Sequence, residues 1–247
     1  NSINSPDIFI KTNVNGTFNL IDTAFKFWME RPFQYKKEYH NSKFLHVSTD
    51  EVYGSLGDTG LFTETTPYAP NSPYSASKAA SDMIVRSYHH TYGMNTVITN
   101  CSNNYGPHQH KEKLIPTIIN NALECKPIPI YGDGNNVRDW LYVVDHCKGI
   151  NLAYQKGKSG EVYNIGGKNE MTNLQIVTIV CDILDQKVPK KESYKNLIKF
   201  VDDRFGHDRR YAIDASKIEN ELGWQAEEVF NTGIIKTIDW YIQNHKD

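Results

Sequence analysis

The stretch VSTDEVYG, residues 47–54, sets two carboxylates side by side directly after a short apolar run. The run KFLHVS predicts a strand, so that Thr49, Asp50 and Glu51 follow at its carboxyl end. Two adjacent carboxyl groups can supply a general base and a general acid together, because like charges held close push their pKa values apart. The alternative is a solvated turn, which is the more common setting for an acidic pair on a loop.

A second reactive pair is Tyr74 and Lys78 in PYSASK, four residues apart on a predicted helix. This spacing places both side chains on one helix face. An ammonium group beside a phenol favours the phenolate, so we expect the pKa of Tyr74 to fall. Such a tyrosine could take a proton from a sugar hydroxyl while a nicotinamide accepts the hydride. Tyr and Lys four apart also occur by chance, as a solvated pair.

The elements that must position these groups alternate between helix and strand in the first half of the chain. Predicted helices are 6–30, 73–92, 113–124, a helix capped by Asp145 that runs to about 155, 172–186, a short helix within 209–224, and 231–246. Predicted strands are 43–48, 95–101, 127–132, 140–144, 161–167 and 197–201, with 30–43 read as a loop. The alternation predicts an α/β fold with a doubly wound parallel sheet, whose ligands bind at the carboxyl ends of the strands. VSTDE and TNCSNN both follow such ends.

Composition excludes several classes of protein. The 247 residues are 39% hydrophobic and 23% charged, with a net charge of −2, which argues against a general nucleic-acid binder. The four cysteines show no C-x-x-C pair and no zinc spacing, so we expect reduced thiols and no metal site. No apolar run approaches the roughly 20 residues that span a bilayer, and no signal pattern opens the chain. We therefore predict a soluble, cytoplasmic protein.

Seven motifs, taken in order, carry a resemblance to a known family. They are TNVNGT (12–17), STDEVYG (48–54), PYSASK (73–78), NCSNNYGP (100–107), YGDGNNVRDWLYVVDH (131–146), YNIGG (163–167) and RFGHDRRYAID (204–214). Together they resemble the extended short-chain dehydrogenase/reductase family, and within it the dehydratases of nucleotide sugars. The resemblance spans essentially the whole chain. It implies NAD as the cofactor and dTDP-glucose as the substrate, which would lose water to give a 4-keto-6-deoxy sugar.

The resemblance also implies catalytic roles. Tyr74, paired with Lys78, would deprotonate the sugar 4-hydroxyl while hydride passes from C4 to NAD+, and Thr49 would hydrogen-bond the same oxygen. Glu51 would remove the C5 proton and Asp50 would protonate the leaving 6-hydroxyl, after which hydride returns to C6. The sequence alone does not decide which carboxylate takes which role.

Further binding residues follow from the same motifs. The implied cofactor ligands are Thr12, Tyr74, Lys78 and Asn104. The implied substrate ligands are Thr49, Asn103, Lys113, Leu114, Pro129, Ile130, Tyr131, Arg138, Asn173, Arg204 and His207. Arg138 and Arg204 suit a diphosphate, because a guanidinium fork matches phosphate oxygens. The alternative for each arginine is a surface ion pair, with Asp139 or Asp203 as partner.

Two departures from the family stand out. The family opens with a strand, a Gly-rich G-x-x-G-x-x-G turn and a helix that holds the pyrophosphate, and we find no such strand–turn–helix unit here. We therefore expect the chain to be a fragment of a longer enzyme; the alternatives are a truncated, inactive remnant and a second chain that supplies the missing part. The other departure is Phe205, where the family usually has proline, which loosens the loop that carries Arg204 and His207.

Two rival functions remain open. One is a nucleotide-sugar epimerase or decarboxylase of the same superfamily, which would share Tyr74 and Lys78 but usually lacks the Asp-Glu pair. The other is a non-catalytic nucleotide-sugar-binding protein. The predicted domains are a partial dinucleotide-binding domain, 1–108 plus about 139–158, and a substrate domain, 109–138 plus 159–247. The apolar faces of the helices 6–30 and 73–92 predict a homodimer.

Overall fold

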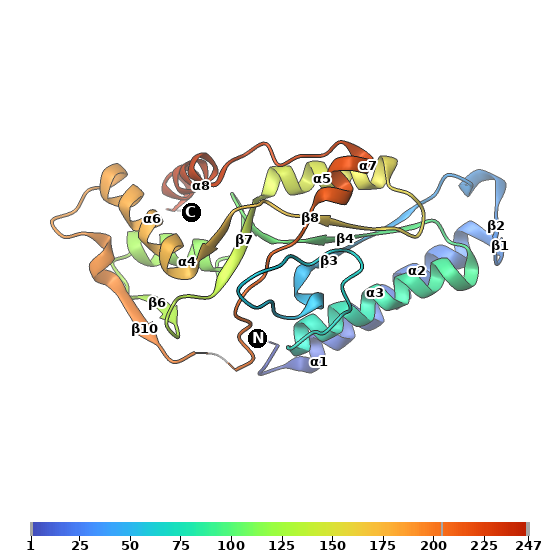
Figure 1. The fold of residues 1–247 in the computed structure, drawn as a ribbon, viewed down its shortest axis with the longest axis horizontal. Coiled ribbons are helices and arrows are strands. Elements are labelled where there is room, and N and C mark those ends of the chain that lie inside the picture. The colour runs from blue at the N-terminus through green and yellow to red at the C-terminus, as the bar shows by residue number, and fades with distance from the viewer. Residues whose placement is uncertain (1, 204, 246–247) are drawn as a thin grey trace. The chain divides into compact units, whose positions relative to one another are not determined.

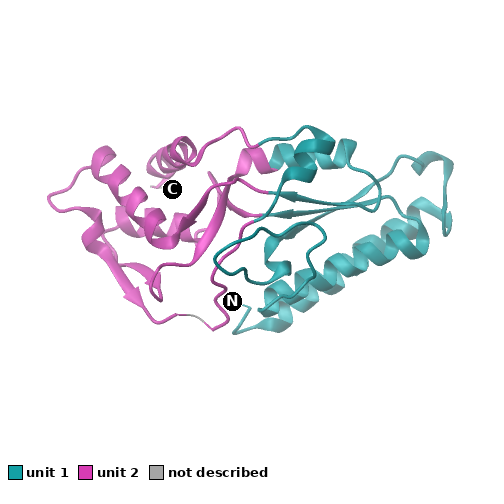
Figure 2. Ribbon diagram, in the orientation of Figure 1, with its two compact units in different colours: residues 1–101, 147–165, 213–225 teal, residues 102–146, 166–212, 226–247 magenta. Residues whose placement is uncertain are grey.

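The structure is a computed structural model of the chain and describes residues 2–203 and 205–245. It divides into two compact units, each built from three stretches of sequence (Figure 2). Unit 1 comprises Asn1–Cys101, Cys147–Ile165 and Ile213–Gln225, and unit 2 comprises Ser102–His146, Gly166–Ala212 and Ala226–Asp247. The chain therefore passes between the units several times.

A parallel three-stranded sheet forms the centre of unit 1 (Figure 1). Its strands are β3 (Phe44–Thr49), β4 (Thr96–Cys101) and β8 (Val162–Ile165), in the order β3-β4-β8. Thr49 pairs with Cys101, and Cys101 pairs with Ile165, so the three strands reach their carboxyl ends in register. The predicted α/β fold with a parallel sheet is confirmed, and the end of β3 is the edge where ligands of such sheets bind.

Helix α3 (Pro73–Tyr92) packs against β3 and β4 and carries the Tyr–Lys motif. It begins with a reciprocal capping box, in which the Ser72 side chain accepts from Ser75 N while Ser75 Oγ accepts from Ser72 N. Pro73 occupies the first turn, where it leaves no unpaired N–H. Gly93 ends the helix in the left-handed conformation, at φ 71°. These signals fix both ends where the sequence predicts them.

The N-terminal helix is less regular than predicted. It consists of α1 (Pro6–Phe9), the π-helix η1 (Ile10–Asn15) and α2 (Gly16–Trp28). The prediction of a loop at 30–43 is wrong in part, because β1 (Met29–Arg31) and β2 (Gln34–Tyr35) form a small antiparallel pair, followed by the 3₁₀ helix η2 (Lys37–Tyr39). These strands have no alternating apolar pattern, so the sequence carried no signal for them.

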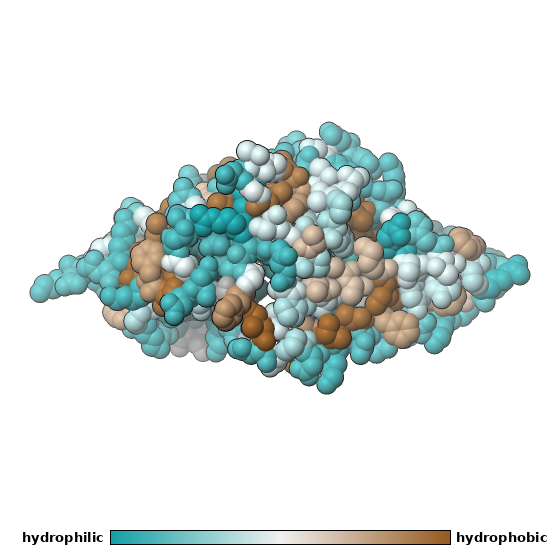
Figure 3. Space-filling view, turned by 60° about the horizontal axis from the view of Figure 1, so that its bottom comes forward, coloured by the Kyte–Doolittle hydropathy of each residue, from teal (hydrophilic) through white to brown (hydrophobic). Residues whose placement is uncertain are grey.

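Hydrophobic side chains remain exposed on the N-terminal helix, although α2 packs against α3 through a small apolar cluster around Ile21 and Val85. The exposed set on α1, η1 and α2 is Ile8, Ile10, Phe18, Leu20 and Phe27. Figure 3 shows hydrophobic residues at the surface among hydrophilic ones. Among the described residues, no helix is both long enough and apolar enough to cross a membrane.

Unit 2 is built around an apolar core. It contains a three-stranded sheet, β5 (Asn103–Tyr105), β7 (Val137–Tyr142) and β9 (Glu170–Thr172), and a parallel pair, β6 (Ile128–Tyr131) and β10 (Ile198–Val201). Helices α4 (Leu114–Leu123), α6 (Asn173–Lys187) and α8 (Phe230–Asn244) bury isoleucine, valine and leucine side chains together. The 3₁₀ helix η4 (Tyr194–Leu197) precedes β10. Strands β5 and β9 are only three residues long and were not predicted.

One predicted helix start is wrong. Helix α5 (Val143–Lys156) begins before Asp145, so Asp145 is no cap of its own helix, and the predicted strand 140–144 ends at Tyr142. The buried Asp145 carboxylate instead accepts hydrogen bonds from the backbone N–H groups of Glu227 and Glu228, at 2.9 and 2.7 Å. It thereby fixes the segment that leads into α8.

The boundaries of the compact units differ from the predicted domain ranges. Residues 102–108 and 139–146 lie in unit 2, whereas 159–165 and 213–225 lie in unit 1. The last stretch includes helix α7 (Ser216–Leu222), which contacts β8. The assignment of a cofactor role to one part and a substrate role to the other stays a prediction.

Candidate active site

The carboxyl end of β3 turns directly into the 3₁₀ helix η3 (Asp50–Tyr53), which carries both carboxylates. Thr49 is the N-cap: its Oγ1 accepts from Glu51 N at 3.3 Å and donates to Asp50 Oδ1 at 3.3 Å. Asp50 is only 1% exposed, whereas Glu51 is half-buried. The acidic pair is therefore no solvated turn, and its two carboxyl groups differ sharply in environment.

Tyr74 lies in the first turn of α3 and is half-buried. Burial raises the pKa of Tyr74, and the negative charges of Glu51, Cys101, Asp50 and Asp82 raise it further. The expectation that the pKa of Tyr74 falls is therefore wrong, because burial and the nearby negative charges raise it. Thr49, Asp50, Glu51, Tyr74 and Lys78 all lie in unit 1, and the charges of Glu51 and Asp50 act on the phenol of Tyr74.

Lys78 reaches from α3 to the backbone of β3. Its Nζ donates to Val47 O at 2.7 Å, and within the described residues this uses one of its three donors. Burial lowers the pKa of Lys78, whereas the nearby Asp82 and Cys101 raise it. The ammonium is thus anchored at the carboxyl end of the sheet with two donors available for a ligand.

This donor set fits the nicotinamide-ribose end of NAD. Two ammonium donors of Lys78 and the Tyr74 hydroxyl can hold ribose hydroxyls at the edge where dinucleotides bind in such sheets. Residues 54–60, GSLGDTG, match the spacing of the Gly-rich turn letter by letter, yet they form a loop that opens no helix, since the next helix begins at Pro73. They are therefore no pyrophosphate cradle. Thr12 is exposed on η1, and the structure shows no contact that assigns it a ligand.

The predicted diphosphate ligand Arg138 is buried in unit 2, at 5% exposure. Its guanidinium donates to the carbonyl oxygens of Val137 at 2.7 Å and Asp208 at 2.9 Å, and it stacks on the Tyr211 ring at 4.2 Å. Asp139, the alternative ion-pair partner, instead accepts from the N–H groups of Gly167 and Asn169. Arg138 is thus a buried guanidinium that is oriented by backbone carbonyl oxygens.

The loop with His207 is only partly described. His207 Nδ1 lies 2.7 Å from Asp203 Oδ1, so the aspartate that was the alternative partner of Arg204 contacts the histidine. Arg204 itself lies outside the described residues. Phe205 is 89% exposed, which is consistent with a loop position that does not need a packed side chain.

The other predicted ligands are spread over several elements of unit 2. Asn103 and Asn104 lie on β5, where Gln109 donates to Asn104 O at 2.7 Å, and Lys113 caps α4 next to Leu114. Pro129, Ile130 and Tyr131 lie on β6, with Ile130 buried and Tyr131 exposed. Asn173 opens α6. Their roles as ligands stay predictions.

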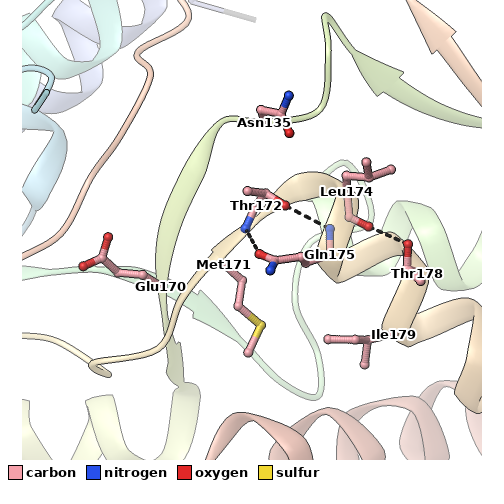
Figure 4. A pocket seen from close by; sticks show the side chains of 8 residues that line it. All are labelled: Asn135, Glu170, Met171, Thr172, Leu174, Gln175, Thr178 and Ile179. Carbon is pink, nitrogen blue, oxygen red and sulfur yellow. Dashed lines mark hydrogen bonds between the residues drawn. The ribbon is translucent and has the colours of Figure 1, made fainter. Parts of the chain in front are cut away.

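Unit 2 also contains a surface pocket of about 670 Å³ beside the start of α6 (Figure 4). Met171, Leu174 and Ile179 supply its apolar part. Two of its polar side chains accept from backbone N–H groups, because Gln175 Oε1 accepts from Thr172 N and Thr172 Oγ1 accepts from Gln175 N. None of the predicted ligands that the structure describes lines this pocket. Among the described residues, no three His, Cys, Asp or Glu side chains gather as they would around a metal ion.

Several residues of the site were missed by the sequence analysis. Asn13 Nδ2 donates to Ser77 Oγ at 2.9 Å, and Phe9 packs edge-on against Tyr74 at 5.9 Å, so the N-terminal helix supports the start of α3. Asp82 lies beneath Lys78 and is completely buried. Its spacing of four from Lys78 was visible in the sequence, but only the structure shows that this face is buried.

The parallel sheet with a Tyr–Lys pair at its carboxyl edge defines an α/β protein of the dehydrogenase/reductase class. A family model described as GDP-mannose 4,6 dehydratase matches residues 1–237. The chain belongs to this family of nucleotide-sugar dehydratases.

Two individual relatives show which kind of dehydratase the chain resembles. The chain is 54% identical over 245 residues to a dTDP-glucose 4,6-dehydratase of Xanthomonas campestris pv. campestris, a match that covers 98% of this chain and 69% of the relative. It is also 54% identical, over 252 residues, to the dTDP-glucose 4,6-dehydratase of Salmonella typhimurium, with the same coverage. The chain thus spans about 70% of the length of these relatives.

Solved structures agree. The dTDP-glucose 4,6-dehydratase of Streptomyces venezuelae, crystallised with NAD, superposes with a TM-score of 0.88 at 44% identity, covering 99% of this chain and 70% of that one. A UDP-glucuronic acid 4-epimerase of Bacillus cereus, in complex with UDP-glucuronic acid and NAD, gives 0.80 at 26% identity, covering 95% and 68%. The fold is shared with epimerases, but the sequence is much closer to dehydratases.

Proposed function

We propose that the protein dehydrates dTDP-glucose to dTDP-4-keto-6-deoxyglucose, as an NAD-dependent hydro-lyase. The observation that carries this proposal is the placement of Asp50 and Glu51 on η3, directly after Thr49 at the carboxyl end of β3, where their charges act on Tyr74. Epimerisation needs a base at C4 alone, whereas elimination of water needs a base and an acid in addition. The relatives named dTDP-glucose 4,6-dehydratase support the choice of nucleotide and sugar.

The proposed chemistry divides among four side chains. Tyr74 takes the proton of the sugar 4-hydroxyl, and Thr49 hydrogen-bonds the same oxygen. Glu51 then removes the C5 proton, which the new 4-ketone has made acidic, and Asp50 protonates the leaving 6-hydroxyl as water. NAD, when bound, would supply the hydride transfer from C4 to C6. Glu51 finally returns a proton to C5.

The unequal burial of the two carboxyl groups supports this division of roles. Burial disfavours the charged form of a carboxyl group, so the buried Asp50 suits the acid and the more exposed Glu51 suits the base. Thr49 Oγ1 accepts from the backbone N–H of Glu51 and donates to Asp50 Oδ1, so it fixes the turn that carries both residues. Lys78 holds the ribose, and Arg138, oriented by backbone carbonyls, binds the diphosphate.

The quaternary structure follows from the exposed helix. We propose a homodimer through helices 6–30 and 73–92, supported by the exposed Phe18, Leu20 and Phe27 on α2 and Met83 on α3. A sedimentation experiment at micromolar concentration should show a dimer, and a monomer alone would contradict the proposal. A cytoplasmic location is proposed as well, supported by four cysteines that form no disulfide: Cys101, Cys125, Cys147 and Cys181.

The function is tested by incubating the protein, expressed from its natural gene, with dTDP-glucose and NAD. The expected product has lost one water, and mass spectrometry detects it as the 4-keto-6-deoxy sugar. An epimerised sugar of unchanged mass would favour the epimerase instead. Tight binding of dTDP-glucose without any conversion would overturn catalysis and leave a nucleotide-sugar-binding protein.

A further inference from the structure

Asp82 is a completely buried carboxylate that the proposed chemistry does not use. It lies on α3, and its exposed fraction is 0%. Ser48 Oγ and Tyr68 OH both donate to Asp82 Oδ2, at 2.8 and 3.0 Å. His46 Nε2 lies 3.1 Å from Oδ1 without the geometry of a hydrogen bond. A carboxylate held this deeply is costly to bury, so its retention calls for an explanation.

The position of Asp82 ties it to the active site. Tyr74, Lys78 and Asp82 follow one another at intervals of four, so they share one face of α3. This face packs on β3, as Figure 1 shows for the two elements. Lys78 bonds to the backbone of Val47, and Asp82 bonds to the next residue, Ser48. Helix and strand are thus joined at two adjacent points just before Thr49.

The charge of Asp82 also acts on Lys78. Burial lowers the pKa of Lys78, whereas Asp82 and then Cys101 raise it. The other titratable groups around this face are His46 on β3, Tyr68 in the loop before α3, and Tyr74, which itself lies near Asp50 and Glu51. Among these groups, Tyr74 and Asp82 lie on the same face of α3 as Lys78, one turn to either side of it, and Asp82 is the carboxyl group of the two.

We propose that Asp82 is a positioning residue, which places a negative charge one helical turn from the half-buried Lys78 and holds α3 against β3 so that Tyr74 faces the carboxylates of η3. This inference rests on the proposed function for the catalytic part of Lys78. The effect of Asp82 on the charge of Lys78 can be measured without turnover. The proposed role of Asp82 and the proposed function can therefore fail separately. A neutral lysine would carry no positive charge to hold a ligand or to stabilise a developing phenolate.

The test is the variant Asp82→Asn in the natural protein, which removes the negative charge and keeps the size of the side chain. Competitive labelling with an amine-reactive reagent, read by mass spectrometry, gives the pKa of Lys78 in each variant. Burial lowers the pKa of Lys78 and the Asp82 carboxylate counteracts this effect. Without the carboxylate, the pKa of Lys78 should therefore fall by about one unit or more. The alkaline limb of kcat should move to lower pH by the same amount. An unchanged pKa of Lys78 in Asp82→Asn would overturn the proposal.

Controls separate the charge from the packing. Tyr68→Phe removes one hydrogen bond and leaves the carboxylate, so thermal stability should fall while the Lys78 titration stays in place. Asp22→Asn removes the charge of another carboxylate, the one that accepts from the Tyr88 hydroxyl between α2 and α3, and should not move the Lys78 titration either. If Asp82→Asn does not fold, Asp82→Glu is the second variant. It keeps the negative charge, so the pKa of Lys78 in this variant should equal that of the wild type. A downward shift in Asp82→Glu would contradict an electrostatic role.

Discussion

The two compact units bury polar and apolar side chains in different places. In unit 1, the buried side chains around the proposed catalytic residues are polar. Examples are Ser48, Asp50, Asp82 and Asn100, which are all nearly inaccessible to solvent. In unit 2, α4, α6 and α8 bury an almost wholly apolar cluster, and its buried arginine is met by carbonyl oxygens. Buried polar groups cost free energy unless they are paired, whereas apolar burial stabilises directly. Substitutions should therefore reduce catalysis in unit 1 and stability in unit 2.

The largest effect is expected for Tyr74→Phe, which removes the proposed base for the 4-hydroxyl. We expect kcat to fall by about 1,000-fold with little loss of stability, because loss of a general base costs two to four powers of ten. Tyr88→Phe is the matched control on the same helix, since its hydroxyl donates to Asp22 at 2.9 Å. It should cost about 1 kcal/mol of stability and leave kcat within a few-fold. Equal kcat values in the two variants would count against the site.

In the apolar cluster of unit 2, we expect substitutions to lower stability. Ile238 is completely buried on α8, so Ile238→Ala should lower the free energy of unfolding by about 3 kcal/mol, through lost burial and the cavity left behind. Ile235 on the same helix is 40% exposed, and Ile235→Ala should cost well under half as much. Denaturant titration measures both. A small loss at Ile238 would show that this core tolerates cavities and that the contrast between the units is wrong.

Stability should also depend on pH through His146, which is buried on α5. Burial lowers the pKa of His146 to about 4, from 6.5 for an exposed imidazole. Between these values the unfolded chain binds a proton and the folded chain does not, so stability falls as pH drops from 6.5 towards 4. The shift corresponds to roughly 3 kcal/mol. His146→Gln should flatten this part of the profile, whereas a substitution at the exposed His90 should not; an unchanged slope in His146→Gln would refute the assignment.

The smallest effect is expected at the diphosphate ligand. Arg138→Lys loses the guanidinium fork and its bonds to the carbonyls of Val137 and Asp208, so KM for dTDP-glucose should rise about tenfold with a smaller change in kcat. Arg209 makes an exposed ion pair with Asp133 at 3.1 Å, and Arg209→Lys should leave KM nearly unchanged. Equal KM values in both variants would place the diphosphate elsewhere.

Local signals explain what the sequence could predict. Ser72-Pro73 and Gly93 mark both ends of α3, and the apolar run before Thr49 marks β3, so the strand end and the helix face that carry the site were predictable. The sequence could not predict that the pKa of Tyr74 is raised, because this shift depends on burial and on carboxylates that folding brings together. Asp82 was missed for the same reason. The short strands β5 and β9 have too few residues for a periodic pattern.

The central claim is that Glu51 and Asp50 divide the roles of base and acid. It is tested most directly by following deuterium uptake at C5 of dTDP-glucose in D₂O. Asp50→Asn should still exchange the C5 proton but lose water slowly, whereas Glu51→Gln should lose both exchange and dehydration. Exchange that persists in Glu51→Gln and disappears in Asp50→Asn would reverse the two roles. Normal exchange and dehydration in both variants would show that this acidic pair is not the site of elimination.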